Sequence, residues 1–131
     1  MLVHDAARPC LHTDDLTRLI AALSQDVVGG LLASPVSDTL KLSDESCSVS
    51  ATVAREKLWR ALTPQMFRVG VLQRALRIAK ERGVTVTDES AAVEALGLKP
   101  KLISGRNDNI KITLPEDLAY AEYLLRARMN Q

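Results

Sequence analysis

The sequence predicts an α/β fold in which helices cover a sheet made largely of buried strands. Amphipathic segments with helical spacing alternate along the chain with short apolar segments that are typical of interior strands. The 131 residues are also enough to bury a core, and 47% hydrophobic with 25% charged residues is ordinary for a globular domain. We therefore expect a single domain over residues 1–131.

The first 36 residues predict a strand, a helix and a second strand. Met1–Val3 has the composition of the last residues of a buried strand. Thr13 is the expected N-cap of a helix with Asp14 and Asp15 in its first turn, where negative charge is favourable. The run Val27–Val36 is continuously apolar and contains two glycines, which is typical of a strand buried on both faces of a parallel sheet.

Residues 37–56 are predicted to form a projecting β-hairpin arm. Thr39–Leu42 and Val49–Val53 alternate polar with apolar residues, and a polar segment separates them. An isolated hairpin with so few apolar side chains is not stable in water. We therefore expect the arm to pack on another surface, and a second copy of the chain is the natural candidate.

The remainder of the chain predicts helices alternating with short strands. Leu58–Phe67 is expected to be a loop broken by Pro64, followed by a helix over residues 69–82 that ends at Gly83. Thr87 is the expected cap of a short helix.

Two further strands and a final helix complete the predicted fold. Lys101–Ser104 and Ile110–Thr113 are the expected strands, and Thr113 with Glu116 forms a capping box around Pro115. The apolar residues of the last helix are expected to face the core, and they are Leu114, Leu118, Ala121, Leu125 and Met129.

Composition excludes several classes of function. A net charge of +1 gives no general attraction for nucleic acid or anionic membranes, and 3% aromatic residues are too few for stacking on single strands. The sequence has no apolar stretch of membrane-span length and no export pattern at its N-terminus, so we expect a cytoplasmic protein. Cys10 and Cys47 lie 37 residues apart without a CxxC motif, which argues against a zinc site or a disulfide.

The candidate functional residues form a dispersed polar set, because the sequence lacks GxGxxG, GxxxxGK[ST] and GxSxG motifs. Each lies at the end of a predicted strand or in a loop, and they are Asp5, Arg8, Thr39, Arg55, Thr63, Thr87 and Lys111. Ligands of α/β sheets bind at the C-terminal ends of strands. Cations, hydroxyls and one carboxylate suit a phosphate ester with a divalent metal. Taken singly, each is more often a solvated charge or a cap than a ligand-binding group, and Lys111 between Ile110 and Ile112 is the best candidate among them. His4 is better interpreted as a structural histidine than as a general base.

Five segments carry a resemblance to a known family. They are VHDAARP (Val3–Pro9), ASPVSDTLK (Ala33–Lys41), TVAREKLWRALTPQMF (Thr52–Phe67), TVTDESAAVEALG (Thr85–Gly97) and GRNDNIKITLPEDL (Gly105–Leu118). In this order they resemble the 2-C-methyl-D-erythritol 4-phosphate cytidylyltransferases of non-mevalonate isoprenoid biosynthesis. The resemblance implies a three-layer α/β/α nucleotidyltransferase (Rossmann-like) fold and a homodimer joined by the arm. It also implies Mg²⁺-dependent transfer of CMP from CTP to methylerythritol phosphate, with release of pyrophosphate.

The resemblance also implies roles for single residues around the metal and the nucleotide. Asp5 matches a position near the metal and the substrate, Ala6 a backbone contact to the nucleotide, and Arg8 a contact to the substrate. Lys111 resembles a lysine that stabilises charge at the reacting phosphorus.

Further roles concern the methylerythritol phosphate. Thr39, Thr87 and Lys111 resemble its binding groups within one subunit. Arg55 and Thr63 resemble residues that reach its phosphate from the arm of the neighbouring subunit.

The sequence departs from the family in one respect. The family's Gly-rich loop, with the Arg and Lys that grip the CTP triphosphate, has no counterpart in these residues. We therefore expect a fold incomplete at its N-terminus, the C-terminal portion of a single cytidylyltransferase domain, which turns over negligibly by itself. Two alternatives stay open: a ribitol 5-phosphate cytidylyltransferase, whose matching segment usually resembles HDSVRP or HDAVRP, and a non-catalytic dimerisation fragment.

Overall fold

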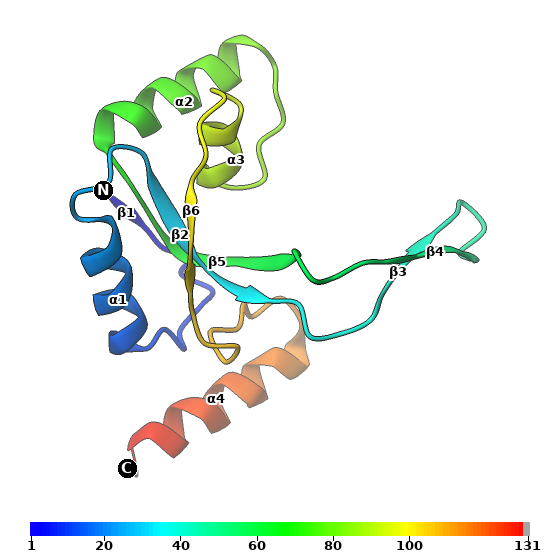
Figure 1. Cartoon of the computed structure of the whole chain (residues 1–131). Coiled ribbons are helices and arrows are strands. Elements are labelled where there is room, and N and C mark those ends of the chain that lie inside the picture. Colours follow the sequence, from blue (N-terminus) through cyan, green and yellow to red (C-terminus); the bar gives the residue numbers. More distant parts are fainter. Residues whose placement is uncertain (130–131) are drawn as a thin grey trace.

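The computed structural model describes residues 1–129 and forms its main sheet from strands in the order β1–β5–β2–β6 (Figure 1). In chain order these are β1 (Leu2–Val3), β2 (Gly29–Pro35), β5 (Trp59–Phe67) and β6 (Lys101–Ser104). β2 pairs in parallel with β6 and antiparallel with β5, and β1 pairs antiparallel with β5. β1, β2 and β6 therefore run in the same direction, and their C-terminal ends lie at the same edge of the sheet.

Helices cover both faces of the sheet, and they are α1 (Thr13–Leu23), α2 (Val69–Glu81), α3 (Glu89–Glu94) and α4 (Pro115–Met129). Phe67 packs with buried residues of α2 and α3, whereas its neighbour Met66 packs against the cluster that contains Leu19 and Leu23 of α1. Successive side chains of a strand point to opposite faces, so the two clusters lie on opposite sides of β5. The predicted three-layer α/β/α arrangement is confirmed.

The two predicted N-terminal strands differ in burial. β2 is an interior strand with residues 29–34 buried, as predicted. β1 is an edge strand, and 42% of Leu2 is exposed, so the expected burial of Met1–Val3 is wrong.

The predicted loop at Leu58–Phe67 is wrong, because this segment is the long interior strand β5. Its pairing with β2 shifts register between Leu31 and Ala33, opposite the residues around Pro64. Proline is tolerated in sheets at such irregularities, where its missing N–H leaves no ladder bond unmade.

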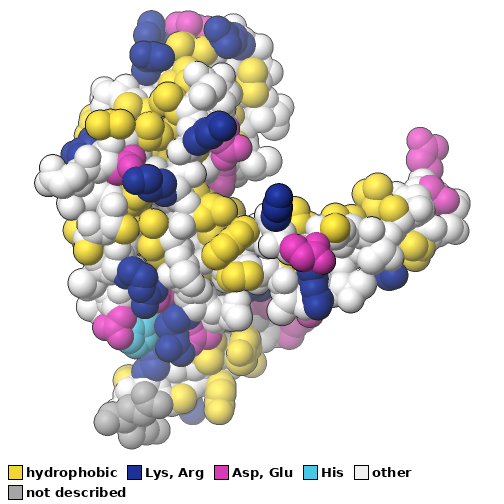
Figure 2. All heavy atoms as spheres, viewed as in Figure 1, with side chains coloured by type: hydrophobic (Ala, Val, Ile, Leu, Met, Phe, Trp, Pro, Cys, Tyr) yellow, Lys and Arg dark blue, Asp and Glu magenta, His cyan; other side chains and the backbone are white. Residues whose placement is uncertain are grey.

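The predicted arm is confirmed as an antiparallel hairpin of β3 (Leu40–Ser43) and β4 (Val49–Val53). It projects well clear of the body of the molecule (Figures 1 and 2). Leu42 and Val49 on the arm are exposed. Over the face shown in Figure 2, basic and acidic side chains are interspersed, which agrees with the small net charge.

Two helix caps lie one residue away from their predicted positions. His12, not Thr13, caps α1, because its side chain accepts a hydrogen bond from the Asp14 backbone N–H. Asp88, not Thr87, caps α3, and its carboxylate accepts from a backbone N–H in the first turn. The side chain of Thr87 is therefore not used as a cap.

The C-terminal quarter differs most from prediction. Residues 110–113 form an extended connection rather than a strand, tied to the body by the Ile112 N–H, which donates to the Ala7 carbonyl at 2.8 Å. Asp117 in the first turn of α4, not Glu116, accepts from the N–H groups of Thr113 and Leu114, which precede the helix. Of the apolar residues expected to face the core only Ala121 is buried, and the exposed ones are Leu114, Leu118, Leu125 and Met129. None of the described helices is both long and apolar enough to cross a membrane.

Candidate functional site

A polar pocket of about 360 Å³ lies at the edge of the sheet where β1 ends. Five of the predicted site residues line it, and they are Asp5, Arg8, Thr63, Thr87 and Lys111. These residues come from four separate segments of the chain. The structure therefore brings these five residues around one cavity, although Thr63 lies within β5 and Thr87 lies in the loop before α3 rather than at the end of a strand.

A carboxylate between two cations forms the charged part of the pocket. Asp5 Oδ2 lies 3.5 Å from Arg8 Nε and 3.4 Å from Lys111 Nζ. The Arg8 side chain is only 12% exposed, whereas those of Asp5 and Lys111 are 38% and 49% exposed. Arg8 is therefore the most restrained of the three, while Asp5 and Lys111 are more open to solvent, and all three line the pocket.

Arg8 is held in place by backbone oxygens. Its Nη1 donates to the Asn109 carbonyl at 2.7 Å, and its Nη2 donates more weakly to the Ala61 carbonyl at 3.4 Å. Burial lowers the pKa of the Arg8 guanidinium from its ordinary value, and the neighbouring Asp5 carboxylate acts in the opposite direction. A guanidinium stays protonated through such shifts, so Arg8 presents a fixed positive charge.

Thr63 connects the first strand to the pocket. Its Oγ1 accepts from the Asp5 backbone N–H at 3.0 Å and lies 2.8 Å from His4 Nδ1. His4 Nε2 in turn lies 3.0 Å from the Arg8 carbonyl oxygen. The VHDAARP segment is therefore closed into a compact turn against β5.

The loop that carries Lys111 is held by a buried carboxylate, Asp15, which the sequence predicts only as a favourable charge in the first turn of a helix. Asp15, fully buried on α1, accepts from the Arg106 backbone N–H at 2.8 Å and from Arg18 at 2.9 Å. Further along the same loop, Arg106 lowers the pKa of Asp108, which also pairs with Arg128. The loop that delivers Lys111 is thus anchored at several points.

Asn109 is a buried residue that the sequence analysis missed. It is 1% exposed, and its Nδ2 donates to the Thr63 carbonyl at 2.8 Å. Its own carbonyl receives the bond from Arg8. No sequence signal distinguishes Asn109 from the exposed polar residues beside it.

The other predicted site residues lie elsewhere in the chain. Thr39 and Arg55 are on the arm, where Arg55 donates to the Ser37 carbonyl, and neither lines the pocket of its own chain. The expected grouping is therefore wrong: Thr63 is in the pocket with Asp5, and Thr39 belongs with Arg55. Ala6 lines a separate apolar hollow against α4.

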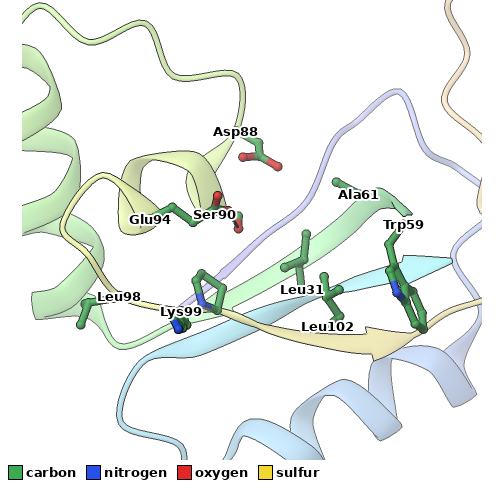
Figure 3. Close-up of a pocket in the computed structure, with 10 residues that line it drawn as sticks. Leu31, Trp59, Ala61, Asp88, Ser90, Glu94, Leu98, Lys99 and Leu102 are labelled. Carbon is green, nitrogen blue, oxygen red and sulfur yellow. Dashed lines mark hydrogen bonds between the residues drawn. The ribbon is translucent and has the colours of Figure 1, made fainter. Parts of the chain in front are cut away.

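A second pocket, of about 370 Å³, adjoins the first and shares Ala61 and Asp88 with it (Figure 3). Its floor is apolar, with Leu31 and Leu102 on neighbouring strands. The carboxylates at its rim already have partners, since Glu94 accepts from the Ser90 hydroxyl and Asp88 accepts from the Gln65 amide. The Asp88–Gln65 bond of 2.9 Å forms part of the wall between the two pockets.

The donor set fits Mg²⁺ only in combination with a ligand's own oxygens. Among residues 1–129 no group of three or more His, Cys, Asp and Glu is arranged to hold a metal ion. Asp5 can supply one carboxylate, and both of its ion pairs are made through Oδ2. Mg²⁺ is commonly held by one or two carboxylates together with substrate phosphates and water.

The chain is similar in sequence to known proteins over nearly its whole length. Residues 1–127 match the family model for 2-C-methyl-D-erythritol 4-phosphate cytidylyltransferase (IspD). The chain is 57% identical over 124 residues to the protein of that name from Pectobacterium atrosepticum, covering 95% of the chain and 52% of the relative. It is 53% identical over 131 residues to the one from Hahella chejuensis, covering 100% of the chain and 54% of the relative.

Solved structures with the same name have the same fold. The enzyme from Francisella tularensis matches with a TM-score of 0.86 and 36% identity, over 94% of this chain and 58% of that one. The enzyme from Thermus thermophilus matches with a TM-score of 0.86 and 34% identity, over 95% of this chain and 61% of that one. The chain thus spans about half the length of the curated relatives it matches.

Proposed function

Because the chain belongs to the 2-C-methyl-D-erythritol 4-phosphate cytidylyltransferase family, we propose that its polar pocket binds 2-C-methyl-D-erythritol 4-phosphate. We propose further that the whole protein transfers CMP from CTP to that phosphate. The observation that carries the proposal is the meeting of Asp5, Arg8, Thr63, Thr87 and Lys111 around one cavity.

The chemistry of the transfer explains these residue types. A phosphate oxygen of the ester attacks the α-phosphorus of CTP, the bond to the bridging oxygen breaks, and pyrophosphate leaves. Little covalent work is left to the protein, so catalysis is positioning together with stabilisation of the developing negative charge. Arg8 is the fixed cation and Lys111 the mobile one, which is the division expected for a planar fork and a flexible ammonium.

The net negative charge of the pocket lining indicates that additional cations are needed to bind a phosphate there. Its lining carries the two cations Arg8 and Lys111 and the three carboxylates Asp5, Asp88 and Glu89. A doubly charged phosphate would therefore meet an excess of negative charge unless further positive charge accompanied it. Mg²⁺ held partly by Asp5 supplies that charge when bound and polarises phosphate oxygens.

The second source of positive charge is the arm of another copy. Thr39 directly precedes β3 and Arg55 follows β4, so both lie at the base of the arm, which projects clear of the body (Figure 1), and neither lines the pocket of its own chain. We infer that two copies exchange arms, so that Arg55 and Thr39 of one copy meet the phosphate held by the other. The exposed apolar residues Leu42 and Val49 of the arm would then be covered by the partner.

Calorimetric titration of the chain with 2-C-methyl-D-erythritol 4-phosphate in Mg²⁺ tests the proposal. Binding is expected for this ester, with weaker binding for ribitol 5-phosphate and none for unphosphorylated methylerythritol. Equal binding of the phosphorylated and unphosphorylated polyols would contradict a phosphate site. Tighter binding of ribitol 5-phosphate would favour the alternative cytidylyltransferase. We expect negligible CMP transfer from these 131 residues alone, because they contain no glycine-rich triphosphate loop.

A further inference from the structure

His4 is the ionisable residue of the HDAAR segment that the proposed function leaves without a role. Its imidazole is in contact with two groups of the pocket region at once. His4 Nδ1 lies 2.8 Å from Thr63 Oγ1, and His4 Nε2 lies 3.0 Å from the Arg8 carbonyl oxygen. The ring therefore bridges β5 and the turn that carries Arg8.

With a neutral imidazole, the chemistry of these partners fixes the directions of the three hydrogen bonds around His4 and Thr63. A carbonyl oxygen can only accept, so His4 Nε2 must carry the hydrogen that binds Arg8. In a neutral imidazole the other nitrogen, Nδ1, is then an acceptor, and the Thr63 hydroxyl must donate to it. The Thr63 oxygen in turn accepts the Asp5 backbone N–H at 3.0 Å.

We propose that His4 is a positioning residue, which holds Asp5 and Arg8 at the pocket through this directed chain of hydrogen bonds. With its hydrogen committed to His4, the Thr63 hydroxyl orients the Asp5 backbone and does not donate to the ligand. The proposal rests on the proposed function for the identity of the ligand. The hydrogen-bond arrangement itself can be measured without any ligand.

The first test is nitrogen-15 NMR of the imidazole rings in the unliganded chain with the rings neutral. The chain has only two histidines, so a His12→Asn variant assigns both sets of signals. The expected result is a single Nε2–H tautomer for His4, with Nδ1 shifted by an accepted hydrogen bond. Conversion of Thr63 to Val is expected to remove that shift. An Nδ1–H tautomer, or a tautomer mixture that Thr63→Val leaves unchanged, would overturn the proposal.

The second test is the affinity of these variants for 2-C-methyl-D-erythritol 4-phosphate. Loss of a positioning hydrogen bond is expected to weaken binding about tenfold in His4→Ala. His4→Asn, whose amide can still accept from Thr63, is expected to lie between His4→Ala and the unmodified chain. Because His4 and Thr63 belong to the same series of hydrogen bonds, the effects of His4→Ala and Thr63→Val on affinity are expected to be less than additive.

His12→Ala is the matched control, because His12 also makes one side-chain hydrogen bond to the backbone, at the cap of α1 and outside the pocket. It is expected to lower the melting temperature while leaving the ester affinity unchanged. Equal losses of affinity in both variants would show that His4 affects binding only through the stability of the fold, and this result would overturn the proposal. Failure of the unmodified chain to bind the ester would instead refute the proposed function, and the NMR result would still decide the role of His4.

Discussion

Asn109 illustrates how a single buried side chain organises the pocket at the scale of residues. Its side-chain Nδ2 donates to the Thr63 carbonyl, and its backbone carbonyl accepts from Arg8 Nη1. Lys111 follows two residues later. The Asn109 Oδ1 is buried without a hydrogen-bond partner among the described residues. The positions of β5, of the turn after β1 and of the loop that carries Lys111 thus depend on a residue that touches no predicted ligand.

Replacement of Asn109 by Ala should lower the free energy of unfolding by about 1–3 kcal/mol, because the Thr63 carbonyl loses its buried donor. Urea denaturation measures this change. The exposed Asn107 two residues earlier is the control, and Asn107→Ala should change stability by less than about 0.5 kcal/mol. An equal effect of the two substitutions would contradict the role given to Asn109.

Replacement of Lys111 by Gln should weaken binding of methylerythritol phosphate by about 10- to 100-fold, the usual range for a hydrogen bond to a charged group. Calorimetry at two salt concentrations measures the loss and its ionic character. Lys80→Gln, at an exposed lysine in the last turn of α2, removes the same charge away from the pocket and should leave affinity unchanged. An unaltered affinity in Lys111→Gln would place the ester elsewhere.

The sequence predicted the charged members of the pocket but not the residues that hold them. Asp5, Arg8 and Lys111 stand at strand ends or in an apolar context, and such positions are where α/β sheets bind ligands. Asp15 and Asn109 are buried only because distant segments fold over them, and a helix N-terminus or a polar loop is their ordinary setting. Local pattern therefore contained no signal for their burial.

At the scale of elements, the positions of helices and exposed turns can be predicted from the sequence. Which strands pair with each other in the sheet cannot. α2 begins and ends nearly where its apolar spacing and Gly83 predict. Pro64 is a strong local signal against a strand, so the sequence predicts a loop there, and only the register shift between β2 and β5 accommodates the proline within β5. α4 has a periodic apolar face that the sequence assigned to the core, and most of that face is exposed.

The turn between α1 and β2 gives a prediction about acid stability. Asp26 pairs with Lys101 at 2.6 Å and accepts from the N–H groups of Val28 and Gly29. The Lys101 hydrogen bond, with those two backbone bonds, lowers the pKa of Asp26 from 3.8 to about 2. Because folding depresses this pKa, the carboxylate stabilises the fold above about pH 4, and the contribution is lost as pH falls from about 4 to about 2.

An Asp26→Asn variant should therefore show a free energy of unfolding that depends less steeply on pH between about 4 and 2. Chemical denaturation over this range measures the slope. Lys101→Met removes the largest cause of the shift and should change the slope in the same direction. Superimposable slopes for all three proteins would show that Asp26 does not couple folding to pH.

At the scale of the whole molecule, the proposed exchange of arms makes each site a composite of two copies. A Lys111→Gln chain has an impaired pocket and an intact arm, whereas an Arg55→Ala chain has the reverse. If arms are exchanged, random 1:1 mixing restores both parts in about one quarter of the sites. Calorimetry should detect this recovery of tight ester binding.

Mixing Lys111→Gln with a second pocket variant, Arg8→Gln, is the matched control, because both defects then lie in the pocket. A mixed dimer of these two chains has no complete pocket, so tight binding should not return. Equal behaviour of the two mixtures, or a chain that stays monomeric by light scattering, would contradict the exchanged arm.

The central claim is that one polar pocket receives the phosphate of methylerythritol phosphate, and a crystal structure with this ester and Mg²⁺ tests it most directly. The phosphate is expected within hydrogen-bond reach of Arg8, Lys111 and Thr87, with Asp5 beside the metal. An ester bound instead in the adjoining apolar-floored pocket, or along the exposed face of α4, would contradict it.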